Sequence, residues 1–321
     1  MKDTIKLHSA ARKYCIERGY FWRNEYSQMC AESRDRKEDC YNYTDEAYDM
    51  FPRYQVLEAI LTEVEKHKSD DFESIAQAKS QLISDGLSAE SLFTKPSNSE
   101  AIVKIITDEL EKGTFAYLPQ TKRVTKLFEL AEVKAKEFPK PRNNEIKEIA
   151  MNEERQLFIK FINDITEAEL YDIEPMFYRR VISRSESDFL RKKLSDRWCV
   201  AGSYWYPLVE CNREDVVALK DDFFYKDQDI GTLRDILKKR GINRIWELRE
   251  FDTYPGYEID TDAFYPCYTI EGEGYWFSND MDWVIYASHE NSITIAGTWL
   301  IDEVMLAWED WKQRIWLEFT Y

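Results

Sequence analysis

The stretch "DWVIYASHENSITIAGTWL" (residues 282–300) carries the pattern that decides the fold of the second half of the chain. Side chains on either side of "HEN" alternate between two faces, with the period of two that a β-strand imposes. The three residues of "HEN" suit a hairpin loop, and Asn291 suits the left-handed position that such a loop needs. The stretch therefore predicts an antiparallel hairpin with His289 and Glu290 at an exposed tip.

Other strand-like segments surround this hairpin. "AFYPCYTI" and "GYWF" precede it, and the short segments "EGEG" and "SNDM" between them suit an antiparallel meander. "INRIWELRE", "WCVAGSYWYPL" and "MFYRRVI" add strand-like runs upstream. Helices are expected in between. "SRSE" has the capping-box spacing for a helix over residues 183–196, Asn212 and Thr232 are candidate N-caps, and Gly241 suits a helix C-terminus. A last helix is predicted over residues 301–319.

The first half of the chain has the helical period instead. Apolar residues recur three or four positions apart in residues 3–18, 44–66, 72–84, 99–112, 121–136 and 144–171. "YDIEP" (residues 171–175) ends the last of these segments, because the residue before a proline is displaced from helical geometry. We therefore predict an α+β protein. An all-α helical bundle spans residues 1–172, and an α+β domain with an antiparallel meander and a C-terminal helix spans residues 173–321.

Length and composition limit the class of protein. The chain has 321 residues, of which 44% are hydrophobic, so it can bury the cores of two domains. The charged start of the chain lacks the apolar region of a signal peptide, and no apolar run approaches the length of a transmembrane helix. The six cysteines fit no zinc-binding spacing and are expected to be reduced thiols. We therefore expect a cytoplasmic protein with no membrane partner.

Negative charge is concentrated in the second half. The net charge of the chain is −17 at pH 7. Residues 200–321 hold 24 acidic and 11 basic residues, a net of −13, and residues 250–310 hold 14 acidic residues with no lysine or arginine. Because contacts with phosphates need clustered basic side chains, nucleic acid is not expected at the C-terminal domain. The charge favours a basic partner instead.

Motifs with a defined chemistry are absent from the sequence. Glycine-rich nucleotide-binding loops, G-x-S-x-G and H-E-x-x-H do not occur. "KDQDIGTLRDIL" (residues 226–237) has two acids spaced as in a calcium loop but lacks the other ligands of that loop. Metal binding by imidazole is limited because the chain has only three histidines. Asp260, Asp262, Asp280 and Asp282 could form an all-carboxylate site, but they are interpreted as turn residues, and neither a metal nor a cofactor is predicted. His289 is interpreted as a solvated turn residue, and its replacement by alanine should change stability by less than about 0.5 kcal/mol.

The acidic segment is also rich in aromatic residues. Exposed aromatics supply affinity at an interface, while carboxylates steer a basic partner toward it. Inhibitors of nucleases and immunity proteins that neutralise bacterial toxins have this general composition, which is an analogy and not a motif match. We therefore predict a non-catalytic binding protein for a basic protein partner. The residues of the predicted surface are Asp260, Asp262, Glu271, Glu273, Tyr275, Trp276, Asp280, Asp282, His289 and Glu290.

An enzyme is the alternative hypothesis. It would be a hydrolase that uses carboxylates of the same acidic segment, together with a divalent metal in one version. The direction of the carboxylates separates the two hypotheses. Carboxylates spread over a convex face favour binding, whereas carboxylates that converge in a cleft with raised pKa values favour catalysis.

Overall fold

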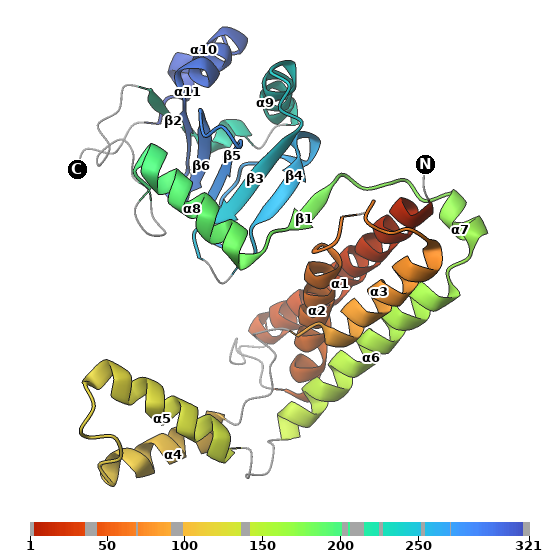
Figure 1. Cartoon of the computed structure of the whole chain (residues 1–321), viewed down its shortest axis with the longest axis vertical. Helices are drawn as coiled ribbons and strands as arrows, with labels where there is room; N and C mark the ends of the chain where they lie inside the picture. The colour runs from red at the N-terminus through yellow and green to blue at the C-terminus, as the bar shows by residue number, and fades with distance from the viewer. Residues whose placement is uncertain are drawn as a thin grey trace. The chain divides into compact units, whose positions relative to one another are not determined.

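The computed structural model describes residues 3–35, 44–68, 70–90, 99–135, 142–200, 205, 215–224, 227–251, 254–269 and 271–316 (Figure 1). The chain divides into two compact units, named here the helical unit and the sheet unit. The helical unit comprises Ala10–Val64 and Ser74–Ile173, and the sheet unit comprises Met1–Ser9, Glu65–Glu73 and Glu174–Tyr321. Among the described residues, no helix has both the length and the apolar character needed to cross a membrane.

The first half of the chain is helical, as its apolar periodicity predicts. Its helices are α1 (Asp3–Asp35), α2 (Asp45–Val64), α3 (Ile75–Ser88), α4 (Ser99–Glu111), α5 (Gln120–Ala135), α6 (Arg142–Asp164) and α7 (Glu167–Tyr171). In the helical unit, α6 packs against α2 and α3, and α4 packs against α5. A Cβ atom at Gly86 of α3 would lie 2.7 Å from the ring of Phe158 on α6, so the glycine allows the two helices to approach closely.

Two of the predicted helices differ from the structure. α1 continues to Asp35, far beyond the predicted end at residue 18, and the helix predicted over residues 144–171 is divided into α6 and α7. A capping box causes the division. The N–H of Glu169 donates to the hydroxyl of Thr166 (3.3 Å), and the N–H of Thr166 donates to the carboxylate of Glu169 (2.8 Å). These bonds start a new helix after residue 166.

The second half of the chain forms one antiparallel sheet. Its strands are β1 (Arg179–Val181), β2 (Val216–Lys220), β3 (Arg244–Arg249), β4 (Tyr257–Asp260), β5 (Gly274–Phe277), β6 (Val284–Ser288) and β7 (Ser292–Ala296). They lie in the order β1-β4-β3-β5-β6-β7-β2, and each neighbouring pair is antiparallel. β5, β6 and β7 are the predicted meander. The predicted α+β class is confirmed.

Helices cover both faces of the sheet (Figure 1). One core joins side chains of all seven strands to α9 (Asp227–Lys239) and α10 (Thr298–Ala307). The other core joins the opposite side chains of the central strands to α8 (Arg184–Trp198). Alternate residues such as Tyr275 and Trp276 therefore enter different cores, and every residue of β5, β6 and β7 is buried.

The capping box predicted at the start of α8 is confirmed, because the N–H of Glu186 donates to the hydroxyl of Ser183 (3.2 Å). The strand predicted at "AFYPCYTI" is wrong. Its first residue ends a short 3-10 helix (Thr261–Ala263), and Pro266 has no N–H to donate to a ladder. The strand β4 lies just before this segment and was not predicted.

Two further helix predictions are corrected. Thr232 is not an N-cap but lies inside α9, where its hydroxyl donates to the carbonyl of Gln228 (3.0 Å). Within the described residues, the single helix predicted over residues 301–319 is instead α10 and α11 (Trp311–Arg314), because the backbone leaves helical geometry at Trp308; residues 317–319 lie outside the described part of the chain. Asn212 and most of "WCVAGSYWYPL" lie outside the described residues.

Candidate functional site

The register of the sheet places the predicted surface residues at two opposite ends. Gly274 pairs with Ala287, and Phe277 pairs with Val284. Residues before β5 and after β6, which include Glu273 and His289, therefore lie at one end. The turn between β5 and β6, which contains Asp280 and Asp282, lies at the other. The five residues of β6 separate the two ends by roughly 17 Å. The ten predicted residues therefore do not form one surface.

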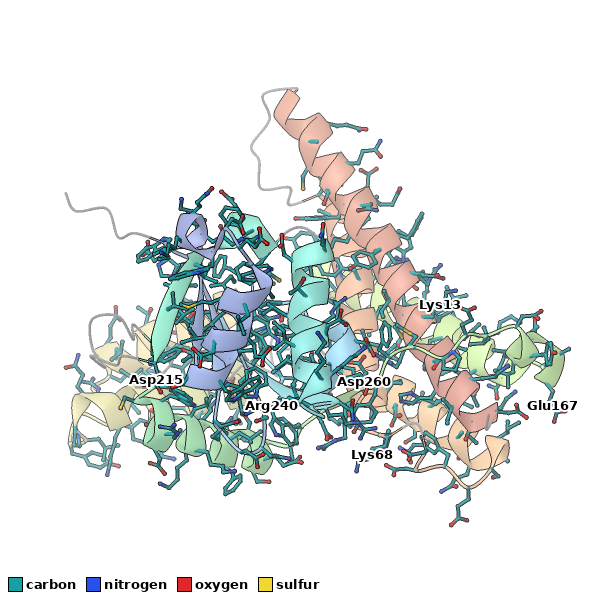
Figure 2. The ribbon with its side chains drawn as sticks, turned by 90° about the horizontal axis from the view of Figure 1, so that it is seen from above. Lys13, Lys68, Glu167, Asp215, Arg240 and Asp260 are labelled. Atoms are coloured by element: carbon teal, nitrogen blue, oxygen red, sulfur yellow. The ribbon has the colours of Figure 1, made fainter. Side chains whose placement is uncertain are left out.

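Four predicted aspartates lie at the far end. Asp260 ends β4 (Figure 2), where its carboxylate accepts a hydrogen bond from the N–H of Tyr178 (2.8 Å) and lies 3.6 Å from the guanidinium of Arg244. Asp262 forms an ion pair with Lys238 of α9. Asp280 and Asp282 are exposed in the turn between β5 and β6. Two of the four carboxylates are thus already compensated by a basic side chain of the sheet unit.

The two predicted aromatic anchors are not available to a partner. Tyr275 is 1% exposed, and Trp276 is fully buried. Tyr275 packs in the core beneath α8, and Trp276 packs in the core beneath α9 and α10. The prediction of exposed aromatics at these positions is therefore wrong, because helices cover both faces of the sheet.

The predicted hairpin loop is confirmed. Ser288 pairs with Ser292, which leaves His289, Glu290 and Asn291 as the loop, and Asn291 has the left-handed φ of 56°. The side chain of His289 is 50% exposed, as expected for a tip. It is nevertheless not a free surface histidine, because its Nδ1 lies 2.6 Å from Oε1 of Glu273, a side chain that is 1% exposed.

Glu273 is a buried carboxylate held by the β6–β7 hairpin. Its Oε1 accepts hydrogen bonds from the hydroxyl of Ser288 (3.1 Å) and from the backbone N–H of His289 (3.4 Å), in addition to its contact with the imidazole. Its Oε2 accepts a hydrogen bond from the hydroxyl of Tyr286. Because a buried charge is costly unless it is hydrogen-bonded, this set of donors explains how the carboxylate is tolerated.

The electrostatics of this cluster favour a protonated imidazole. The bond to Glu273 is the largest cause that raises the pKa of His289, and the charges of Glu273, Glu290 and Glu250 raise it further, while partial burial opposes them. Nε2 of the same ring lies 3.2 Å from Oε1 of Glu290. Burial, followed by the proximity of Tyr275 and the bond to Glu273, holds the pKa of Tyr286 far above its ordinary value.

Exposed aromatic side chains border this cluster. Phe251 and Tyr268 are 48% and 52% exposed. The ring of Tyr268 lies 6.2 Å from that of His289, and Glu250 and Phe251 both lie against Gly272, where a Cβ atom would be 3.0 Å and 3.1 Å from them. We name this surface the acidic aromatic rim. It consists of Glu250, Phe251, Tyr268, Glu271, His289 and Glu290.

A basic side chain beside the rim is compensated by carboxylates of the sheet unit. Arg249 ends β3 and is buried, with its guanidinium 2.8 Å from the carboxylate of Glu247 and 3.4 Å from that of Glu271. It also lies over the ring of Trp276. Glu271 therefore contributes less charge to the rim than Glu250 and Glu290 do.

Phe251 and Tyr268, together with Glu250, are the site residues that sequence reasoning missed. Glu250 directly follows β3; of the two aromatic residues, Phe251 comes next in the chain and Tyr268 lies in the segment wrongly predicted to be a strand. Both belong to the aromatic-rich segment, but the chain has no local signal that marks them as exposed. Only the pairing of β3 with β5, and of β5 with β6, brings them to the same end as His289.

In the part of the chain that the structure describes, no group of three or more His, Cys, Asp or Glu side chains is arranged to hold a metal ion. We found no match to a protein-family model, to a curated protein or to a solved structure.

Proposed function

We propose that the protein is a non-catalytic binding protein that recognises a basic protein partner through the acidic aromatic rim. The observation that carries the proposal is the position of the two half-exposed aromatic rings, Phe251 and Tyr268, beside the carboxylates of Glu250 and Glu290 at one end of the sheet. Aromatic rings gain affinity by leaving water, and the surrounding carboxylates attract lysine and arginine side chains. The charge of −13 over residues 200–321 supports steering of such a partner.

A catalytic function is the second candidate, and the Glu273–His289 pair favours it. A carboxylate on Nδ1 holds an imidazole in one orientation, as a general base requires. The base would act through Nε2, which lies 3.2 Å from the carboxylate of Glu290 on a half-exposed loop. A general base also needs a substrate pocket that shields it from water. The arrangement therefore supports binding better than catalysis.

Capture of partners with matched charge variants tests the proposal. The baits are the parent protein, Glu250→Lys with Glu290→Lys at the rim, and Asp280→Lys with Asp282→Lys at the far end of the sheet. Both variants change the net charge equally, and all four altered residues are exposed except Glu250, which is partly buried. We expect the parent and the far-end variant to recover the same basic proteins from the native host, and the rim variant to lose them. Recovery of the same proteins by all three baits would show that the rim is not the binding surface.

The aromatic residues give an independent test. Phe251→Ser and Tyr268→Ser remove aromatic rings that are about half-exposed in the free protein, so each should speed dissociation of a captured partner and leave the association rate nearly unchanged. Surface plasmon resonance at two salt concentrations separates this effect from steering, since only the association rate should fall steeply with salt.

A further inference from the structure

We infer that His289 is a proton-operated switch of the acidic aromatic rim, which holds Glu290 when the imidazole is protonated and releases Glu290 to a basic partner when the imidazole is neutral. The inference rests on the proposed function, and it adds a regulation of that same surface. It begins with the fact that the two nitrogens of one ring face two different carboxylates, 2.6 Å and 3.2 Å away.

The buried carboxylate fixes which nitrogen keeps its proton. Glu273 is 1% exposed and can only accept hydrogen bonds while it is ionised. Nδ1 of His289 lies 2.6 Å from this carboxylate and must therefore carry a hydrogen in the neutral ring as well as in the charged ring. The proton that His289 gains and loses is consequently the one on Nε2.

That proton decides the state of Glu290. In the charged ring, the protonated Nε2 lies 3.2 Å from Oε1 of Glu290, which forms an ion pair inside the rim. In the neutral ring, Nε2 presents a lone pair to the same carboxylate and no longer attracts it. The side chain of Glu290 is 51% exposed, so it is free to turn toward a lysine or arginine of a partner once the ion pair is lost.

The groups that face the ring come from several elements. Glu273 precedes β5, Glu290 shares the loop, and Glu250 follows β3. All three are acidic and favour the charged ring, while the phenol ring of Tyr268 lies alongside it. Tyr286 and Ser288 of β6 donate to Glu273 and keep its carboxylate in place. Thus the switch operates above the ordinary pKa of a histidine.

The direction of the effect follows from the charge. Loss of the proton makes the rim more negative by one unit and frees one carboxylate, so a basic partner should bind more tightly as the pH rises through the pKa of His289. By linkage, binding of the partner must lower the pKa of His289 by the corresponding amount. One unit charge roughly 7 Å away in water changes affinity by about threefold.

Nuclear magnetic resonance titration measures the switch directly and needs no natural partner. The chain has three histidines, so the ring signals of His289 are assigned by their loss in His289→Gln, while His8 and His67 serve as internal controls. We expect Glu290→Gln to lower the pKa of His289, and an added oligolysine peptide to lower it in the parent protein. If Glu290→Gln leaves that pKa unchanged, the ion pair does not exist and the inference is overturned, whether or not the peptide binds.

Binding of the oligolysine peptide at different pH values tests the consequence. The parent should bind about threefold more tightly above the pKa of His289 than below it. His289→Gln should show no such change, Glu290→Gln should move the change to a lower pH because its imidazole still loses a proton, and the far-end control Asp280→Asn should behave like the parent. Binding by the parent that does not depend on pH would overturn the switch and leave the proposed function standing. Absence of binding by the parent at every pH would count against the proposed function itself.

Discussion

Two buried glutamates, one in each unit of the molecule, are held in different ways. Glu154 of α6 is fully buried, and its carboxylate receives the guanidinium groups of Arg18 and Arg53 and the indole N–H of Trp22. The indole nitrogen lies 2.9 Å from Oε1 of Glu154, and Nη1 of Arg53 lies 3.2 Å from it. The bond to Glu154 is the main cause that raises the pKa of Arg18. Two permanent cations therefore compensate this charge.

Glu273 has no arginine among the partners that the structure shows for its carboxylate. Its partners are the hydroxyls of Tyr286 and Ser288, and the imidazole and backbone N–H of His289. Of these, only the imidazole can carry a positive charge, and it does so only when protonated. The cations that compensate Glu154 are therefore arginines, which stay charged at neutral pH, whereas the cation beside Glu273 is an imidazole whose charge depends on pH.

The largest expected effect on stability comes from removing the charge of Glu154. Glu154→Gln removes the fully buried carboxylate that joins Arg18 to Arg53, while Arg53 keeps Asp49 and Glu153, and it should lower the free energy of unfolding by about 3 kcal/mol. Urea denaturation followed by circular dichroism measures this change. The matched control is Glu153→Gln, because Glu153 also contacts Arg53 (2.6 Å) but is half-exposed, and it should cost less than about 1 kcal/mol. Equal effects of the two variants would show that burial does not distinguish these ion pairs.

A smaller effect on stability is expected from removing the charge of Glu273. Glu273→Gln keeps the shape of the side chain but replaces one acceptor oxygen with a donor, which must then face a hydroxyl or an N–H. The loss of these bonds should lower the free energy of unfolding by about 2 kcal/mol. Glu290→Gln, at the exposed loop, is the control and should change it by less than about 0.5 kcal/mol. A Glu273→Gln protein as stable as the parent would mean that the hydroxyls reorient and satisfy the amide.

Local features of the fold were predictable from the sequence. The three-residue loop and the left-handed Asn291 depend only on loop length and on one residue type, and both are present. The capping box of Ser183 and Glu186 is equally local. The predicted limits of a helix were wrong where a capping residue interrupts the apolar periodicity. At Thr166, the side chain caps a new helix although the apolar stripe continues through it.

The candidate site was less predictable, because it depends on pairing between distant segments. The alternation in "GYWF" shows that two faces exist, but it cannot show that α8 covers one of them while α9 and α10 cover the other. The sequence therefore predicts Tyr275 and Trp276 at a surface, whereas both are buried. Similarly, Glu273 and His289 lie sixteen residues apart, and only the register of β5 with β6 brings their side chains together. This contact also changes the expected effect of His289→Ala on stability. The variant should lower the free energy of unfolding by about 1 kcal/mol, more than the sequence alone predicts, because a bond to a buried carboxylate is lost.

The smallest expected effect is a dependence of the free energy of unfolding on pH. We expect it from the Glu273–His289 pair and not from the ion pairs of Glu154. The pKa of His289 is raised in the folded protein above its unfolded value of about 6.5, so the stability that this pair contributes is fully present below about pH 6.5. It is lost as the pH rises through the folded-state pKa. Because the imidazole is half-exposed, solvent screening limits the contribution to less than about 1 kcal/mol.

The free energy of unfolding, measured from about pH 6 to about pH 9, should therefore fall more in the parent than in His289→Gln. The difference between the parent and Glu154→Gln should stay constant over the same range, since arginine does not titrate there. A parent and a His289→Gln protein with parallel curves would remove the distinction between the two clusters. If the curves diverge as expected, the proton that stabilises the hairpin is the same proton that withholds Glu290 from a basic partner, and stability and binding would change in opposite directions with pH.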